Sequence, residues 1–148
     1  MTGKIFVLNG PNLNLLGSRE PETYGTLTLD DIKASVSRQA GKLGLITDFR
    51  QTNQEGELVD WIQEGGSKAD GIILNAAAYT HTSVAIHDAV AAIKTPVIEV
   101  HLSNIFARED YRHHSYVSDV SVGVICGLGA KGYILALDAF ASMLRTAT

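Results

Sequence analysis

The chain has 148 residues, with 12 Lys and Arg against 16 Asp and Glu, and its formal net charge is −4. This length is typical of one domain around one core, so we expect a single domain over residues 1–148. The basic residues are scattered and the net charge is negative, which argues against nucleic acid as a partner. A single cysteine excludes a disulfide within the chain, and we expect Cys126 to be a small buried residue.

The first residues carry no targeting or membrane signal. Lys4 is followed by only four consecutive apolar residues, which is too short for a secretory or membrane-spanning segment. We therefore expect a soluble, cytoplasmic protein that does not bind a membrane.

Short apolar runs alternate with helical patterns from the start of the chain. The run 4–8 predicts a buried strand. Thr28 with Asp31 predicts a capped helix start, and Gly44 predicts the end of that helix. Residues 45–51 alternate in polarity, which predicts a strand nearer the edge of a sheet.

The same alternation continues to the end of the chain. The predicted elements are a helix over 57–64 that ends at Gly65-Gly66, a strand over 71–75, a helix over 83–94, a strand over 96–100, a strand over 122–126 and a helix over 130–145. Five strands that alternate with helices predict a mostly parallel sheet covered on both faces. We expect a flavodoxin-like three-layer α/β sandwich with strand order 2-1-3-4-5. The long irregular stretch 101–119 predicts a functional loop.

The segment after the first strand, LNGPNLNLLGSREPETYG over residues 8–25, has the most informative pattern. Glycines and prolines shape its path, and it presents two amides, a guanidinium and a phenol at the carboxyl end of a strand. Open α/β sheets bind their ligands at that end of the strands. The segment therefore predicts a ligand-binding loop.

This pattern closely resembles the N-terminal signature of the type II 3-dehydroquinate dehydratases, enzymes that remove water from a cyclic β-hydroxyketone. Further matches extend over nearly the whole chain, at Asn75, His81, Asp88, residues 99–104, and Arg108 to Arg112. The resemblance implies the flavodoxin-like fold, 3-dehydroquinate as the small-molecule substrate, and a homo-oligomer of trimers that assemble into a dodecamer. We expect no cofactor. The shikimate pathway of aromatic amino acid biosynthesis is favoured over quinate breakdown only as the commoner role.

Three predicted strands end in polar residues, at Asn9, Asn75 and His101, and their loops should converge on one cleft. Glu99 and His101 are two apart on a strand and so face the same way. A carboxylate beside an imidazole orients the ring and favours its cationic form. For an isolated Glu-x-His, a merely satisfied buried histidine would be the better interpretation; the position at a strand end favours a catalytic pair.

Tyr24 predicts a catalytic base, provided that cations stabilise its phenolate. A phenol has an ordinary pKa of about 10, and a lone Tyr-Gly would usually be a turn residue. Arg19 lies on the same loop, and Arg108 and Arg112 lie on the other long loop, so guanidinium groups can approach the phenol.

The residue types then suggest a reaction. Tyr24 would remove the proton next to a ketone, and His101 would protonate the leaving hydroxyl. Asn12, directly or through an ordered water, would stabilise the enolate, and Arg19 would stabilise transition-state charge when its loop closes. The resembled family has the same base and acid, with the Arg-bearing loop as a lid.

The resemblance also implies residues that bind the substrate. Asn75, His81 and Arg112 are carried over as contacts to its hydroxyl and carboxylate groups. The Leu102-Ser103 turn could receive the carboxylate through two backbone N–H groups and a hydroxyl. Taken alone, Asn75 could close a turn and His81 could cap a helix.

Asp88 lies in the middle of the helix predicted over 83–94, on a side that also carries Val84, Ala91 and Ala92. This side is too apolar for a purely solvated face. We therefore expect a subunit contact, across which Asp88 reaches the neighbouring site.

Two motifs suggest other functions. Residues 127–132 match G-x-G-x-x-G between a strand and a helix, but no βαβ unit or ribose-binding acid follows, so a tight turn is the better interpretation. His113-His114 suggests a metal, but adjacent histidines point apart and no ligand cluster completes a site, so we expect none. The alternative to an enzyme is a flavodoxin-like nucleotide- or flavin-binding module, which this fold alone does not exclude.

Overall fold

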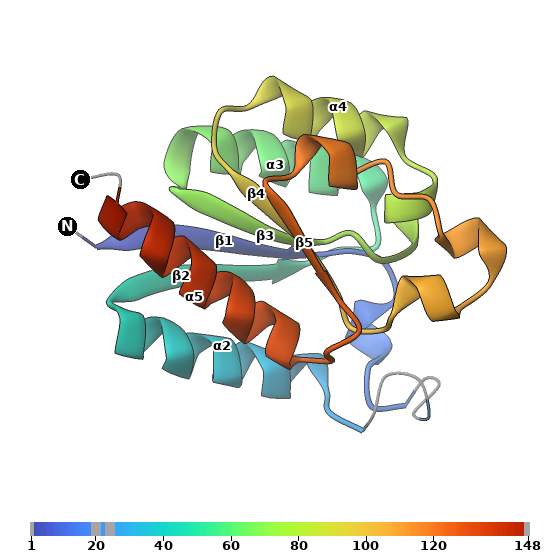
Figure 1. Cartoon of the computed structure of the whole chain (residues 1–148), viewed down its shortest axis with the longest axis horizontal. Coiled ribbons are helices and arrows are strands. Elements are labelled where there is room, and N and C mark those ends of the chain that lie inside the picture. Colours follow the sequence, from blue (N-terminus) through green and yellow to red (C-terminus); the bar gives the residue numbers. More distant parts are fainter. Residues whose placement is uncertain (1, 19–21, 23–25, 147–148) are drawn as a thin grey trace.

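The protein has a single parallel sheet with helices on both of its faces (Figure 1). The computed structural model describes residues 2–18, 22 and 26–146. The strands are β1 (Gly3–Asn9), β2 (Leu45–Gln51), β3 (Gly71–Asn75), β4 (Val97–His101) and β5 (Gly123–Cys126). Their order is β2-β1-β3-β4-β5, and each neighbouring pair is parallel. This order confirms the predicted flavodoxin-like topology.

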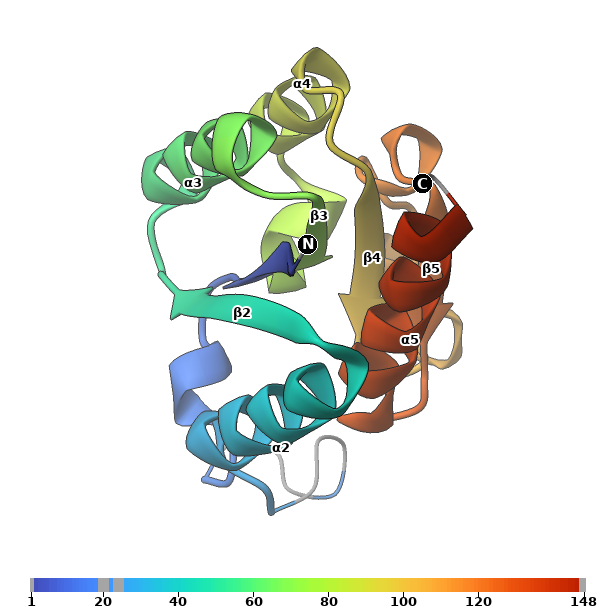
Figure 2. The same ribbon diagram turned by 90° about the vertical axis from the view of Figure 1, so that its left-hand side faces the viewer.

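Two pairs of helices enclose the sheet (Figure 2). Helices α2 (Leu29–Leu43) and α5 (Lys131–Thr146) cover one face, and α3 (Glu55–Lys68) and α4 (Val84–Ala92) cover the other. The core is accordingly divided into two apolar clusters by the sheet. One contains Val7, Ile73 and Phe140, and the other contains Phe6 and Ile72. The side chains of successive residues in the central strands thus pack in opposite clusters, as they do in a sheet buried on both sides.

Helix α2 begins and ends at the residues that the sequence indicates. The Thr28 hydroxyl accepts a hydrogen bond from the Asp31 backbone N–H, and the Asp31 carboxylate accepts one from the Thr28 N–H. Gly44 follows the helix with φ of 71°, in the left-handed region that glycine adopts readily. The predicted capping box and stop are therefore confirmed.

Helix α3 continues beyond its predicted stop. Gly65 and Gly66 lie inside the helix, which ends at Lys68. A Cβ on Gly65 would lie 2.7 Å from the Ile72 side chain and 3.2 Å from Phe6. The glycine therefore serves the close packing of α3 on the sheet, and the prediction that it ends the helix was wrong.

The long connections contain short 3-10 helices. These are η1 (Leu13–Leu15), η2 (Ala77–His81), η3 (Ile105–Ala107), η4 (Asp110–Arg112) and η5 (Ser118–Val120). The stretch after β4 is thus more ordered than the predicted loop, with three consecutive helical turns.

Strand β5 lies at one edge of the sheet, and no other strand of the described residues pairs with its far side. Cys126 is consequently half-buried, and the expectation of a buried thiol was wrong. Among the helices that the structure describes, none has both the length and the hydropathy needed to cross a membrane.

Candidate active site

A pocket opens at the carboxyl ends of the central strands. It is lined by Pro11, Asn12, Leu13, Leu16, Asn75, Ala77, Ala78, His81, His101, Leu102, Ser103, Ile105, Arg108 and Arg112. These residues are the last ones of β3 and β4 together with residues of the segments that follow β1, β3 and β4. The three loops therefore converge as the strand ends predict.

The loop after β1 lies close to the backbone after β3. A Cβ on Gly10 would come within 2.4 Å of the Ala76 carbonyl oxygen, so only glycine fits between the two strand ends. Asn12 follows with φ of 68°, a left-handed conformation that Asn tolerates. Its backbone N–H donates a hydrogen bond of 3.0 Å to Asn53 Oδ1, which fixes the Asn12 backbone at the pocket.

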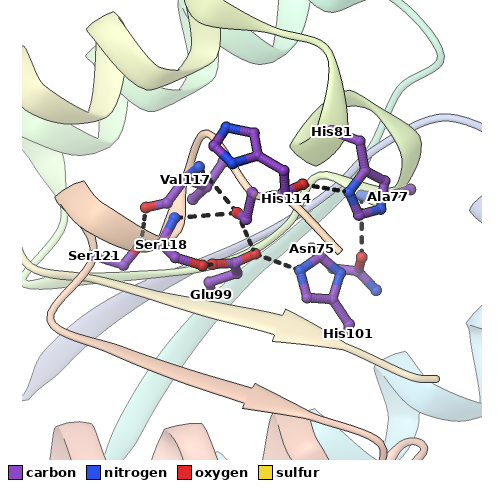
Figure 3. A network of polar contacts seen from close by, with 10 residues as sticks. Asn75, Ala77, His81, Glu99, His101, His114, Val117, Ser118 and Ser121 are labelled. Carbon is purple, nitrogen blue, oxygen red and sulfur yellow. Dashed lines mark hydrogen bonds and ion pairs between the residues drawn. The ribbon is translucent and has the colours of Figure 1, made fainter. Parts of the chain in front are cut away.

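Strand β4 delivers a buried carboxylate and imidazole as a pair (Figure 3). Glu99 Oε2 lies 2.5 Å from His101 Nε2, and the two side chains are nearly inaccessible to solvent. The Ser115 hydroxyl donates to the same carboxylate oxygen at 2.8 Å, and the Ser118 hydroxyl donates to the other. Glu99 lies behind His101 and does not line the pocket. The predicted adjacency of Glu99 and His101 is confirmed.

These donors decide the charge of Glu99. Burial by itself would raise the pKa of the carboxyl group, but hydrogen bonds and charge from His101, with the hydroxyls of Ser118 and Ser115, outweigh it. The net effect lowers the pKa of Glu99 below its ordinary value, so the group is a carboxylate at neutral pH. His101 therefore has a fixed anionic partner on its Nε2 side.

Asn75, at the end of β3, has its amide fixed by two partners. Its Nδ2 donates to the Tyr133 hydroxyl oxygen at 2.9 Å, and its Oδ1 accepts from the Ala77 backbone N–H at 3.2 Å. Ala77 has φ of 54°, an unusual value for a residue with a side chain. This strained turn places the Ala77 N–H on the Asn75 oxygen.

His81 lies at the end of η2, with its ring 6.3 Å from the His101 ring and nearly parallel to it. Its Nδ1 is 2.8 Å from the His114 carbonyl oxygen, which can only accept, so Nδ1 carries the proton. Burial lowers the pKa of His81, assisted by the charges of His101 and Arg112. The ring is therefore neutral near pH 7, with Nε2 as its hydrogen-bond acceptor.

The segment after β4 supplies the cationic wall. Arg108 and Arg112 are largely buried for arginines, with 14% and 18% of their side chains exposed. Arg112 Nε donates to Glu109 at 2.6 Å, and its guanidinium lies 5.3 Å from the centre of the Tyr111 ring. The arginines are thus held at the pocket by neighbouring groups of the same segment.

The predicted site residues fall into four groups. Glu99 forms one by itself, because it is buried against His101 and does not line the pocket. The pocket brings together Asn12, Asn75, His81, His101, Leu102, Ser103 and Arg112. Asp88 lies apart on α4, with 72% of its side chain exposed and its carboxylate 3.0 Å from His87 Nδ1. Arg19 and Tyr24 lie outside the described residues.

Several contributors were missed by the sequence analysis. Ser115 and Ser118 approach Glu99 from 16 and 19 residues away, and Tyr133 reaches Asn75 from the last helix. No local pattern marks these serines, because their role depends on how the segment after β4 folds back. Tyr133 had a weak signal, as an aromatic with a polar tip on the buried side of a helix.

The two competing motifs have structural explanations. In the glycine-rich turn, the Gly127 N–H donates to the His101 carbonyl and the Gly129 N–H to the Leu102 carbonyl. These donors are occupied by the backbone after β4, as in a tight turn. Within residues 2–18, 22 and 26–146, no three His, Cys, Asp or Glu side chains form a metal-binding group, and independence of metal remains a prediction.

The fold and pocket together define a class of protein: a flavodoxin-like α/β protein with a pocket lined by histidine, asparagine and arginine at the carboxyl edge of its sheet. Comparison with known proteins then identifies the family within this class. The family model described as dehydroquinase class II matches residues 3–141. The chain belongs to this family, whose members are lyases of the shikimate pathway.

Individual relatives agree with this assignment. The chain is 62% identical to the 3-dehydroquinate dehydratase of Brucella canis over 145 residues, which cover 98% of this chain and 92% of that protein. The type II dehydroquinase structure from Propionibacterium acnes superposes with a TM-score of 0.93 at 47% identity, covering 96% of this chain and 98% of that one. The corresponding structure from Butyrivibrio crossotus has a TM-score of 0.92 at 42% identity, covering 94% and 97%. The family resemblance seen in the sequence is confirmed, and it favours an enzyme over a flavin- or nucleotide-binding module.

Proposed function

We propose that the protein converts 3-dehydroquinate to 3-dehydroshikimate by eliminating water through an enolate, without a cofactor. The observation that carries this proposal is the buried Glu99–His101 pair, in which His101 lines the pocket. A carboxylate that holds one ring nitrogen of a histidine leaves Nδ1, the other, to exchange a proton with a bound molecule. Elimination of a hydroxyl group needs such a proton donor.

The proposed steps begin at the carbon next to the ketone. Tyr24, as phenolate, takes the proton from that carbon, and the electron pair moves into the carbonyl to give the enolate. When the enolate collapses, the bond to the β-hydroxyl breaks and protonated His101 supplies the proton that turns the hydroxyl into water. Tyr24 is then neutral and His101 is deprotonated, so one proton returns from Tyr24 to His101 through solvent before the next turnover.

Other residues have supporting roles in this proposal. Asn12 stabilises the enolate oxygen through an ordered water, and Arg19 stabilises transition-state charge. Asn75 and His81 contact substrate hydroxyls, for which the neutral His81 ring offers an acceptor at Nε2. The carboxylate of the substrate binds Arg112 and the Leu102-Ser103 turn, with Ser103 contributing its hydroxyl.

The assembly proposal rests on the outer side of α4. Val84 is 54% exposed there, and Ala85, Ala91 and Ala92 are also exposed. We propose that this side is covered in trimers, which assemble into a dodecamer, and that Asp88 reaches the site of a neighbouring subunit. Light scattering after size exclusion tests this directly, because a fully active monomer would contradict it. A cytoplasmic location is part of the same proposal.

The reaction is tested by adding 3-dehydroquinate to the purified protein and following the absorbance of the conjugated enone product. The wild-type protein should form the enone, and Tyr24→Phe should lose nearly all of the rate because the base is removed. Tyr111→Phe is the control: it removes one hydroxyl from a side chain that is 67% exposed and keeps the ring beside Arg112. Enone formation at the wild-type rate by Tyr24→Phe would remove Tyr24 from the mechanism.

A further inference from the structure

A chain of buried polar groups runs behind Asn75, away from the pocket. Tyr133, fully buried on α5, donates its hydroxyl proton to Asn9 Oδ1 at 2.6 Å. The same hydroxyl oxygen accepts from Asn75 Nδ2 at 2.9 Å. Asn9 Nδ2 in turn donates to the Arg50 carbonyl at 3.0 Å. Three side chains from β1, β3 and α5 are thus joined to one backbone carbonyl.

Backbone groups at both ends fix the direction of this chain. The Arg50 carbonyl can only accept, so Asn9 must turn its Nδ2 toward that carbonyl and its Oδ1 toward Tyr133. The Tyr133 proton then points to Asn9, and its oxygen is left to accept from Asn75. At the other end the Ala77 N–H can only donate, so Asn75 Oδ1 must face it. The backbone groups at the two ends therefore require the same direction of donors and acceptors along the chain.

We infer that Tyr133 is a positioning residue for the reaction, because it fixes which way the Asn75 amide faces. A flipped Asn75 amide would bring Nδ2 against the Ala77 N–H and Oδ1 against a tyrosine oxygen whose proton is already committed. The Asn75 amide therefore has one fixed orientation. In it, the second Nδ2 proton and the second lone pair of Oδ1 are left for the pocket. This inference rests on the proposed contact between Asn75 and a substrate hydroxyl.

Tyr133 has no direct chemical role. It does not line the pocket, and burial raises its pKa far above the ordinary phenol value, so it stays protonated. Its effect on the substrate passes through the Asn75 amide alone. Removal of the Tyr133 hydroxyl should therefore weaken substrate binding without changing the chemical step.

The test is a double-mutant cycle of Tyr133→Phe and Asn75→Ala, with KM and kcat for 3-dehydroquinate as the readout. Tyr133→Phe should raise KM about fivefold and Asn75→Ala about tenfold, both with kcat nearly unchanged. In the double variant, Tyr133→Phe should add nothing to the KM of Asn75→Ala, because its only route to the substrate is gone. Phe140→Leu is the control, since it perturbs the same buried side of α5 seven residues on. It should lower the melting temperature and leave KM unchanged.

The outcomes separate this inference from the proposed function. An unchanged KM in Tyr133→Phe, or KM effects that add in the double variant, would overturn the positioning role while leaving the Asn75 contact in place. An unchanged KM in Asn75→Ala would overturn the proposed contact itself, and the inference with it. If Tyr133→Phe does not fold, Asn9→Leu tests the chain from its other end. It frees the Tyr133 proton to face Asn75 and should raise KM about threefold; no change would overturn the inference.

Discussion

Two polar networks reach the pocket from opposite faces of the sheet, and they differ in charge. Asn9 and Asn75 follow Val7 and Ile73 by two residues, on the face covered by α2 and α5, and their chain with Tyr133 is neutral. Glu99 and His101 follow Val97 on the face covered by α3 and α4, and their network contains a carboxylate. Both are buried and both are tied to distant parts of the chain.

The difference shows two ways in which buried groups can control a side chain of the pocket. The neutral network controls only direction, because every proton in it has one place to point. The charged network controls direction and also places a fixed negative charge beside His101, since Glu99 is held as an anion. We therefore expect damage to the neutral network to alter binding, and damage to the charged network to alter the chemical step.

The largest effect should come from the pocket end of the charged network. His101→Ala removes the proposed general acid, and we expect kcat to fall about 10³-fold, because general acid catalysis contributes about 10²–10⁴. Asn75→Ala, at the equivalent position of the neutral network, should leave kcat nearly unchanged. Steady-state kinetics of the two variants compares them. A tenfold loss or less in His101→Ala would assign the proton to another group.

The second largest effect should come from the charge behind His101. Glu99→Gln keeps the side-chain length but removes the anion, and we expect kcat to fall about 10²-fold. The variant must first be shown to fold by circular dichroism. A kcat within threefold of the wild-type value would mean that the carboxylate only satisfies a buried histidine.

The same substitution has a pH signature in stability. The pKa of Glu99 is lowered in the folded protein from an ordinary value of 4.5, so its ionised form stabilises the fold above that pH. The advantage of wild type over Glu99→Gln should therefore be constant near neutral pH. It should shrink as the pH falls below 4.5 through the lowered pKa of the folded state. Urea unfolding across this range measures it, and a difference that grows on acidification would contradict it.

A smaller effect is expected from the serines that hold the carboxylate. The Ser115 hydroxyl donates to Glu99 and also accepts from the backbone N–H groups of Val117 and Ser118. Ser115→Ala should destabilise the protein by about 1–3 kcal/mol, because it takes the acceptor from two backbone N–H groups and one of two partners from Glu99 Oε2. Ser118→Ala removes a single donor to the carboxylate and should cost about 1 kcal/mol. Equal losses in chemical denaturation would mean that the backbone bonds of Ser115 contribute nothing.

These networks also show which parts of the structure the sequence could predict and which it could not. The sheet order, the capping box at Thr28 and the Glu99–His101 pair follow from periodicity and strand parity, which are local properties. The glycines of α3 and the serines behind Glu99 act through contacts with remote segments. The local sequence therefore predicts a helix end at the glycines, which is wrong, and gives no sign that the serines bind Glu99. Gly65 is a residue type that commonly ends a helix. In this protein it lies inside α3, where the nearby Ile72 side chain leaves no room for a larger residue.

The smallest predicted effect distinguishes the two networks most sharply. Between about pH 6 and 9 neither asparagine can titrate, and burial raises the pKa of Tyr133 above this range. The ratio of KM in Tyr133→Phe to KM in the wild-type protein should therefore stay constant within about twofold over this interval. KM measured at several pH values for both proteins tests this. A ratio that changes tenfold would require an ionising group in the network, and the contrast between a neutral and a charged support for the pocket would then fail.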